Sequence, residues 1–454
     1  MFQKSNSEKL SEADYADRVG TNIVHPLGAI VFGFCAIWAI LAPRKYVIWS
    51  VLFIACFISP AQRFAVMGAD FDFLRAITTI LLCRILILGE LRNTRIRAID
   101  YCVLAFVATM VMAVTLRTGG ARTVNELGQT VDGLGLYLIG RAFIRNLDDL
   151  RAMLLGAFIC SVPVMIFFTI EQVTGRNLFS ILGGVTEFTQ VRQDKIRAQG
   201  AFTHPIIAGL FWATFFALFV GLARSRARSL LYRIAGWAGM LSSAIIVVMT
   251  NSSTPIAGIL VAVVGWLCLP YRFFLKQIRW ALLFVLLFIH LIHTKGVHFF
   301  LFVNFNPVSG STGRHRAMLI DGVLKNIPDW ALWGSNRRYN RSFRDITCDY
   351  VYTAVQGGMI PLILELSIIT LAFYACGRAI RAASDREELY LVYGLGVAVL
   401  TVCVMSTAVT VYGQAEVPFF MTFGIAASLG NLDWVSRRRT GTLPTEGSTR
   451  EQAS

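Results

Sequence analysis

Long apolar runs recur along the whole chain, and they constrain its fold more than any other feature. Three of them, Val24–Leu41, Met153–Ile170 and Ala281–Ile292, contain no Asp, Glu, Lys or Arg. A run of about 20 apolar residues is long enough to cross the hydrocarbon core of a bilayer as a helix. Inside lipid the backbone must satisfy its own hydrogen bonds, which favours helices. The sequence therefore predicts an integral membrane protein built from α-helices.

Composition and segment lengths extend this prediction to a polytopic transmembrane helix bundle of the all-α class. Of 454 residues, 56% are hydrophobic and only 15% are charged, too few charges to cover a soluble protein. We expect spans at 24–41, 46–60, 72–88, 100–116, 130–144, 152–172, 203–222, 231–250, 254–270, 279–293, 350–375, 388–409 and 416–431. Thirteen spans would place the N-terminus outside, so twelve spans, with a re-entrant piece within 24–60, is the alternative.

The distribution of Lys and Arg predicts the orientation of the bundle. The net charge is +15, and short loops carry clusters such as Arg92, Arg95 and Arg97, with Arg437–Arg439 after the last span. Such loops are typically cytoplasmic, so the C-terminus is expected inside a bacterial inner membrane. No basic patch lies on a soluble module, which argues against nucleic-acid binding. The expected parts are a polar tail (1–23), the bundle (24–431) and a basic, then disordered, cytoplasmic tail (432–454).

Two long loops, 173–202 and 294–349, fall on the opposite, periplasmic face and are basic. The second loop contains eight Lys and Arg residues but only four Asp residues. Long loops translocate whatever their charge, so this excess has a neutral explanation. The alternative is a surface that holds an anion near the membrane, such as a lipid phosphate.

The nine cysteines give no sign of a metal site. Seven lie in apolar runs or at their edges, and no CxxC or Cys/His spacing occurs. Small apolar packing explains them. No metal and no cofactor is therefore expected.

The segment Ser309–Arg316 is the first candidate site. It is a small-residue loop that leads into a helix with apolar residues at Ala317, Ile320 and Leu324. Free backbone N–H groups at a helix start bind phosphate, and Arg314 and Arg316 would add bidentate donors. The neutral alternative is a polar loop that caps an interfacial helix.

Two further segments flank the periplasmic loops. Arg197 and His204 precede Pro205, which suits the first turn of a helix. Arg197 is either an anion ligand or a snorkelling side chain, and His204 is more typical of a helix entry than of catalysis. Asp349, followed by Tyr350, ends the large loop where the next span begins. Its carboxylate would cap that helix or act as a general base.

Charged residues within or beside spans form the last group. Arg75, Arg84 and Arg145 are readily explained as interfacial residues. Arg141, within the run Leu138–Arg145, is the preferred functional case, because an arginine inside a bilayer usually faces a polar cavity.

In their order, these elements resemble the O-antigen ligase and O-antigen polymerase superfamily. The similar segments are RAQGAFTHPIIAGLF (Arg197–Phe211), GRHRAMLIDGVLKNIPDWALWGS (Gly313–Ser335) and CDYVYTAVQGGMIPLILEL (Cys348–Leu366). ISPAQRFAVMGADFDFLR (Ile58–Arg75) and YLIGRAFIRNLDDLR (Tyr137–Arg151) resemble its exopolysaccharide branch. The resemblance covers roughly residues 58–430. It implies a bundle similar to the GT-C glycosyltransferases, with one large periplasmic loop.

The resemblance also implies a reaction: metal-independent transfer of a glycan from undecaprenyl pyrophosphate to an acceptor sugar at the periplasmic face. By analogy Arg197 and Arg314 would hold the pyrophosphate, helped by Arg141 and Arg316, with His204, His315 and Tyr350 near the substrate. Guanidinium groups would neutralise the leaving group.

A ligase usually has a histidine where this chain has Asp349, and this departure favours a polymerase acting on a lipid-linked repeat unit. The alternatives are a ligase for lipid A-core or another acceptor, and a polysaccharide or lipid transporter. The implied partners are the undecaprenyl-pyrophosphate-linked oligosaccharide, membrane lipid, and a flippase and chain-length regulator.

Overall fold

The computed structural model describes most of the chain between residues 22 and 429. The described ranges are 22–66, 69–92, 94–118, 120–189, 191–192, 195–225, 229–304, 312–335 and 346–429. The expected N-terminal tail, apart from its last two residues, and the expected C-terminal tail with Arg437–Arg439 lie outside them. So do residues 309–311 of the small-residue loop, whereas Thr312 and Gly313 begin α13.

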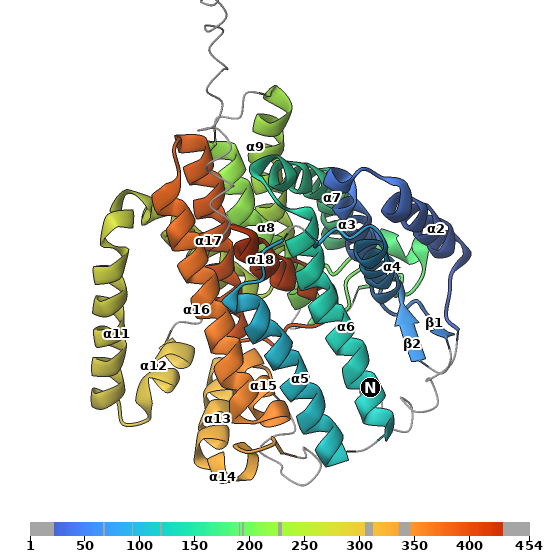
Figure 1. Cartoon of the computed structure of the whole chain (residues 1–454). Coiled ribbons are helices and arrows are strands. Elements are labelled where there is room, and N and C mark those ends of the chain that lie inside the picture. The colour runs from blue at the N-terminus through green and yellow to red at the C-terminus, as the bar shows by residue number, and fades with distance from the viewer. Residues whose placement is uncertain are drawn as a thin grey trace, which may run out of the picture.

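Most of the described residues are helical (Figure 1). The α-helices are α2 (Pro26–Leu41), α3 (Ile48–Phe57), α4 (Phe73–Ile87), α5 (Ala98–Thr118), α6 (Gly120–Phe143), α7 (Leu147–Thr174), α8 (Pro205–Arg224), α9 (Leu230–Met249), α10 (Ser253–Leu267), α11 (Leu275–Ile292), α12 (Gly296–Asn304), α13 (Thr312–Lys325), α14 (Ile327–Trp330), α15 (Asp349–Gly357), α16 (Met359–Ala382), α17 (Arg386–Ser406) and α18 (Glu416–Leu429). Two antiparallel hairpins pair β1 (Arg63–Val66) with β2 (Ala69–Asp72) and β3 (Val191–Arg192) with β4 (Lys195–Ile196). Short 3₁₀ turns are η1 (Arg44–Tyr46), η2 (Leu178–Leu182), η3 (Leu269–Phe274) and η5 (Gly413–Ala415).

Seven helical segments in the described part are long and apolar enough to cross a membrane. They are α5, α7, α8, α9, η3 with α11, α16 and α17. The prediction of a mostly helical structure is therefore confirmed, with seven helices in the described part that could span a membrane. The count of twelve or thirteen spans stays a prediction, since α3, α4 and α18 have 10, 15 and 14 residues, short of a full span.

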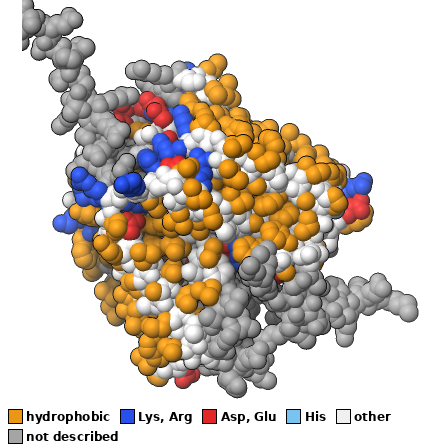
Figure 2. Space-filling model, turned by 45° about the vertical axis from the view of Figure 1, so that its right-hand side comes forward, with side chains coloured by type: hydrophobic (Ala, Val, Ile, Leu, Met, Phe, Trp, Pro, Cys, Tyr) orange, Lys and Arg blue, Asp and Glu red, His pale blue; other side chains and the backbone are white. Residues whose placement is uncertain are grey.

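Apolar side chains cover much of the outer surface, as lipid contact requires. Figure 2 shows hydrophobic side chains spread over the face in view, with Lys and Arg gathered toward one edge. The clearest case is α11, which stands apart from the other helices in Figure 1 and buries none of its residues. Leu283, Phe284 and Leu287 are each about half exposed or more. Such a helix is stable only against an apolar surrounding.

Helix α8 forms the centre of the bundle, and its sequence explains why. Its residues are apolar on every side, and a helix of that kind is normally buried. It packs against α9, α10 and α17, and Trp212, Phe215 and Phe219 on it are almost fully buried. Gly221 lies against the backbone of Tyr390 in α17, where a Cβ atom would be only 2.9 Å from the carbonyl oxygen.

The expected single span 350–375 is two helices, and Gly358 explains the break between α15 and α16. This residue has a φ of +90°, a conformation that only glycine adopts readily. The backbone of the preceding loop fills the break, because the Met359 amide donates to the Ala331 carbonyl at 2.8 Å. A Cβ atom on Gly358 would lie 2.6 Å from the Leu332 carbonyl oxygen. The break positions the start of α15 at the end of the bundle.

Candidate functional site

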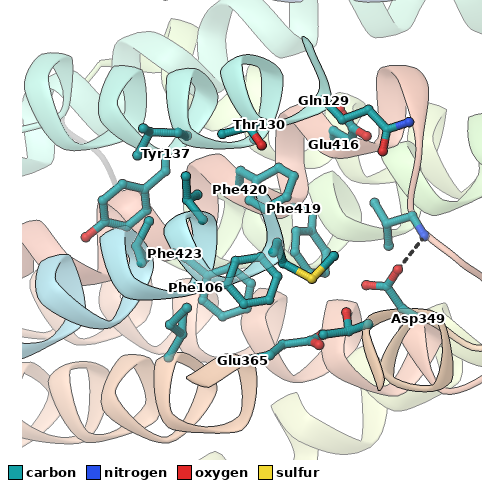
Figure 3. A pocket seen from close by; sticks show the side chains of 18 of the residues that line it. Phe106, Gln129, Thr130, Tyr137, Asp349, Glu365, Glu416, Phe419, Phe420 and Phe423 are labelled. Carbon is teal, nitrogen blue, oxygen red and sulfur yellow. Dashed lines mark hydrogen bonds between the residues drawn. The ribbon is translucent and has the colours of Figure 1, made fainter. Parts of the chain in front are cut away.

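A cavity of about 150 Å³ lies between α5, α6, α15, α16 and α18. Figure 3 shows its lining. Phenylalanines from α5 and α18 make most of the wall, with Tyr137 at one end. The other end is polar and contains Asp349, Glu365, Glu416 and Gln129. A mostly apolar pocket with a few convergent polar groups is the usual form of a small-molecule site.

Asp349 lies at the first position of α15 and faces this cavity. Its side chain does not cap the helix, because the N-cap is Cys348 and makes no side-chain capping bond. Instead, Asp349 Oδ1 accepts a hydrogen bond from the Val411 amide at 3.1 Å. Burial of the carboxyl group raises its pKa to about 7, and the Val411 amide opposes this shift. A carboxylate with such a pKa is suited to accept a proton near neutral pH.

Glu365, on α16, is the second carboxyl group of the cavity, and the sequence analysis missed it. It is only 8% exposed. Thr353 hydrogen-bonds to the carboxyl group, but Glu365 Oε2 has no hydrogen-bond partner. Figure 3 shows Glu365 on the same side of the cavity as Asp349. The signal was a lone carboxylate inside an apolar span, which is costly and usually functional.

Glu416 begins α18 and lies near an ion pair that closes this side of the cavity. Arg75 Nη2 is 2.7 Å from Asp132 Oδ2, and its Nε contacts both oxygens of the same carboxylate. Arg75 also donates from Nη1 to the Asp70 carbonyl at 2.7 Å. Its guanidinium is therefore largely committed to structure, although it interacts electrostatically with Glu416.

The first basic loop meets α15 through the segment before α18. Gln414 donates to the Ala201 carbonyl at 3.0 Å, and the nearby Val411 amide bonds to Asp349. These contacts bring the end of the first basic loop and the start of α15 to the same end of the bundle, which we call the α15 end. Glu171 anchors this loop: it is fully buried and accepts hydrogen bonds from Thr189 and from the amides of Gln199 and Gly200.

Arg197 and His204 take structural positions within that loop. Arg197 Nε donates weakly, at 3.4 Å, to the carbonyl of Thr250 at the end of α9. His204 is the N-cap of α8, and its Nδ1 accepts from the Ile206 amide at 3.1 Å. The helix-entry interpretation of His204 is therefore supported. Neither side chain lines the cavity.

Helix α13 carries the two arginines predicted to hold an anion, and it packs against α15, which begins at Asp349. Arg314 and His315 are exposed, whereas Arg316 is partly buried. Arg316 is close enough to Cys348, the neighbour of Asp349, for an electrostatic interaction, and burial lowers the pKa of its guanidinium. Arg316 is thus near the start of α15, where Asp349 follows Cys348.

The α13–α15 region has a small core of its own that holds these residues. Trp330 is buried and donates from its indole nitrogen to the Val323 carbonyl at 2.9 Å. Tyr350 points away from the cavity, because its hydroxyl donates to the Cys403 carbonyl in α17 at 2.9 Å. The placement of Tyr350 gives no support to its predicted contact with substrate.

Arg141 lies at the other end of the bundle. It is 2% exposed, its Nε is 3.2 Å from Asp100 Oδ1, and its Nη2 donates to the Arg95 carbonyl at 2.7 Å. It is 12 residues beyond Gln129 on α6, or about 18 Å along the helix. The structure does not bring Arg141 together with Arg314 or Asp349.

Of the eight residues that the sequence singled out, Asp349 alone lines the cavity. Within the described ranges, no group of three or more His, Cys, Asp or Glu residues is arranged to hold a metal ion. Comparison with known proteins finds no protein-family model that matches the chain and no curated protein with significant similarity to it.

Proposed function

We propose that the protein is an inner-membrane polymerase that moves a glycan from undecaprenyl pyrophosphate to a lipid-linked repeat unit. One observation carries the proposal: a carboxyl group with raised basicity, Asp349, lines a largely apolar cavity, and Arg316 of α13 interacts with Cys348, its neighbour in the chain. The α15 end would face the periplasm, where such donors are presented. The resemblance of the ordered segments to the O-antigen polymerase superfamily supports the same reaction.

In this mechanism Asp349 is the general base. The acceptor hydroxyl oxygen forms a bond to the anomeric carbon of the donor as its proton passes to the Asp349 carboxylate. The bond between that carbon and the phosphate oxygen breaks, and its electron pair leaves with undecaprenyl pyrophosphate. Arg314 and Arg316 would neutralise the leaving group, since guanidinium forks match phosphate oxygens. Arg197 would assist from the adjacent loop.

Complementation of a deletion strain tests the proposal. Loss of a polymerase leaves single lipid-linked repeat units, whereas loss of a ligase leaves long lipid-linked chains. We expect the Arg314→Ala and Asp349→Asn variants to reach the membrane but make no long glycan. Normal polymer length in both variants would refute the assignment, and accumulated long lipid-linked chains would point to a ligase.

A further inference from the structure

The cavity places carboxyl groups together without a cation. Asp349, Glu365 and Glu416 are part of its lining, and none of the described lining residues is Lys or Arg. Arg75, which interacts electrostatically with Glu416, is already neutralised by its contacts to both oxygens of Asp132. Ionised carboxylates that face one another in a weakly polar space repel strongly. At neutral pH this arrangement requires bound protons.

Among the three carboxyl groups, Glu365 has the surroundings that most require a bound proton. Glu365 is 8% exposed, and no described side chain or backbone group donates a hydrogen bond to its Oε2. Burying an ionised carboxylate without hydrogen bonds costs several kcal/mol, so a group in this position normally takes up a proton instead. Protonation would convert Oε2 into a donor, and Asp349 on the same side of the cavity is an acceptor within its electrostatic reach.

We propose that Asp349 and Glu365 form a proton-binding site in which the two carboxyl groups share one proton. The polar groups around the pair come from each element packed there. They are Thr353 and Tyr352 on α15, Gln129 and Tyr137 on α6, Glu416 on α18, and Tyr350 with Cys403 at the contact between α15 and α17. On α5 the wall is apolar, with Phe106 and Met110. Glu416 interacts electrostatically with Arg75.

The site gives the proposed transfer reaction a destination for its proton, and this role rests on the proposed function. With the shared proton on Glu365, Asp349 is the anion that takes the proton from the acceptor hydroxyl. Both carboxyl groups are then neutral, and release of one proton to water restores the singly protonated pair. The shared proton itself depends only on the geometry of the cavity.

Dicyclohexylcarbodiimide tests the shared proton without any glycan substrate. This apolar reagent adds to protonated carboxyl groups and leaves a stable acylurea, which mass spectrometry locates on the peptide. With purified full-length protein in nanodiscs, we expect Glu365 to be modified at about pH 6, and the rate to fall at least about tenfold by about pH 9. Glu171 is the internal control: it is fully buried but accepts three hydrogen bonds that favour its ionised form, so it should react more slowly than Glu365.

The Asp349→Asn variant shows whether the proton is shared. In this variant the neighbouring carboxylate is absent, so Glu365 holds its proton less tightly. The pH at which the modification rate of Glu365 falls to half its maximum should therefore be at least about one unit lower than in the wild type. Absence of modification at every pH, or an identical pH dependence in both proteins, would overturn the proposal. Thermal unfolding of each variant in the nanodisc confirms that it is folded.

The same two proteins separate this inference from the proposed function. If Glu365 modification follows the expected pH dependence while Asp349→Asn still makes polymer, the transferase assignment fails and the proton site stands. If Asp349→Asn abolishes polymer while Glu365 never reacts, the proton site fails alone. In the Glu365→Gln variant, a pH–activity profile identical to that of the wild type would remove Glu365 from the proton path.

Discussion

The two ends of the bundle treat buried charge in opposite ways. At the end that contains Asp100, arginines pair with carboxylates: Arg141 with Asp100 at 3.2 Å, and Arg44 with Asp149 at 2.9 Å. At the α15 end, Asp349 and Glu365 face a cavity whose described lining contains no cation. Paired charges hold helices in register, whereas unpaired carboxyl groups titrate and react.

The comparison explains why an arginine inside an apolar run was a poor guide to the site. Arg141 is costly in a membrane, but Asp100, the Arg95 carbonyl and Ser428 satisfy it. Glu365 is also costly, and one of its oxygens stays unsatisfied. A functional group in such a bundle is therefore better recognised by a missing partner than by its charge.

The largest effect is expected at the unpaired end, from the Asp349→Asn change. An amide preserves the shape of the side chain but cannot accept the acceptor's proton, so transfer should fall at least about 100-fold. The measurement is polymer formed per molecule of membrane-inserted protein. Because Asn retains an oxygen that accepts from the Val411 amide, the fold should survive, and unchanged transfer would exclude Asp349 as the base.

The second-largest effect is expected at the end of the bundle that contains the Arg141–Asp100 pair. Arg141→Ala removes the cation from Asp100, whose side chain is 15% exposed and still accepts a hydrogen bond from Tyr137. The protein should be destabilised by about 1–3 kcal/mol. Thermal unfolding in detergent would measure this loss. Transfer per folded molecule should change little, because Arg141 lies far from Asp349. A variant that is stable but inactive would instead indicate that Arg141 binds substrate, as the sequence suggested.

The sequence predicted the long apolar helices well and the amphipathic ones poorly. Spans expected at 203–222 and 231–250 correspond to α8 (Pro205–Arg224) and α9 (Leu230–Met249). Helix α6 was expected at 130–144 but begins at Gly120, because its first residues are polar and give no hydropathy signal. Hydropathy identifies helices made of apolar residues, but it does not identify a polar helical segment that packs against other helices.

The site was predictable only in part, for a similar reason. Asp349 could be found because it stands at the border between a polar loop and an apolar run. Glu365 and Glu416 join it through the packing of α16 and α18 against α5 and α6, and no local pattern encodes those contacts. A lone carboxylate within an apolar run was visible in the sequence, but its neighbours were not.

A pH series separates function from stability at the α15 end. Activity that depends on ionised Asp349 should fall about tenfold for each pH unit below about 7, because the carboxyl group is then protonated. Stability should change in the other direction. A carboxyl group whose pKa is raised by folding stabilises the folded state most below its unfolded value, and this contribution is lost as the pH rises toward 7.

Transfer assays and thermal unfolding over the same pH range would show both trends. In the Asp349→Asn variant the stability trend from this group should disappear, since its amide does not titrate. Activity that is constant between about pH 5 and about pH 8 would contradict the role of Asp349 as base.

The smallest effect is expected from Arg176→Ala, the matched control for the α13 arginines. Arg176 lies in the basic loop at the same end as Arg314, but it is 62% exposed and pairs with Glu187 at 2.7 Å. Exposed pairs contribute little, so stability should change by less than about 1 kcal/mol and polymer length should be unchanged. If Arg176→Ala reduced the polymer as strongly as Arg314→Ala, the positive charge of the whole α15 end would matter more than its placement. The contrast between the two ends would then be one of net charge, and no specific phosphate contact at α13 would be needed.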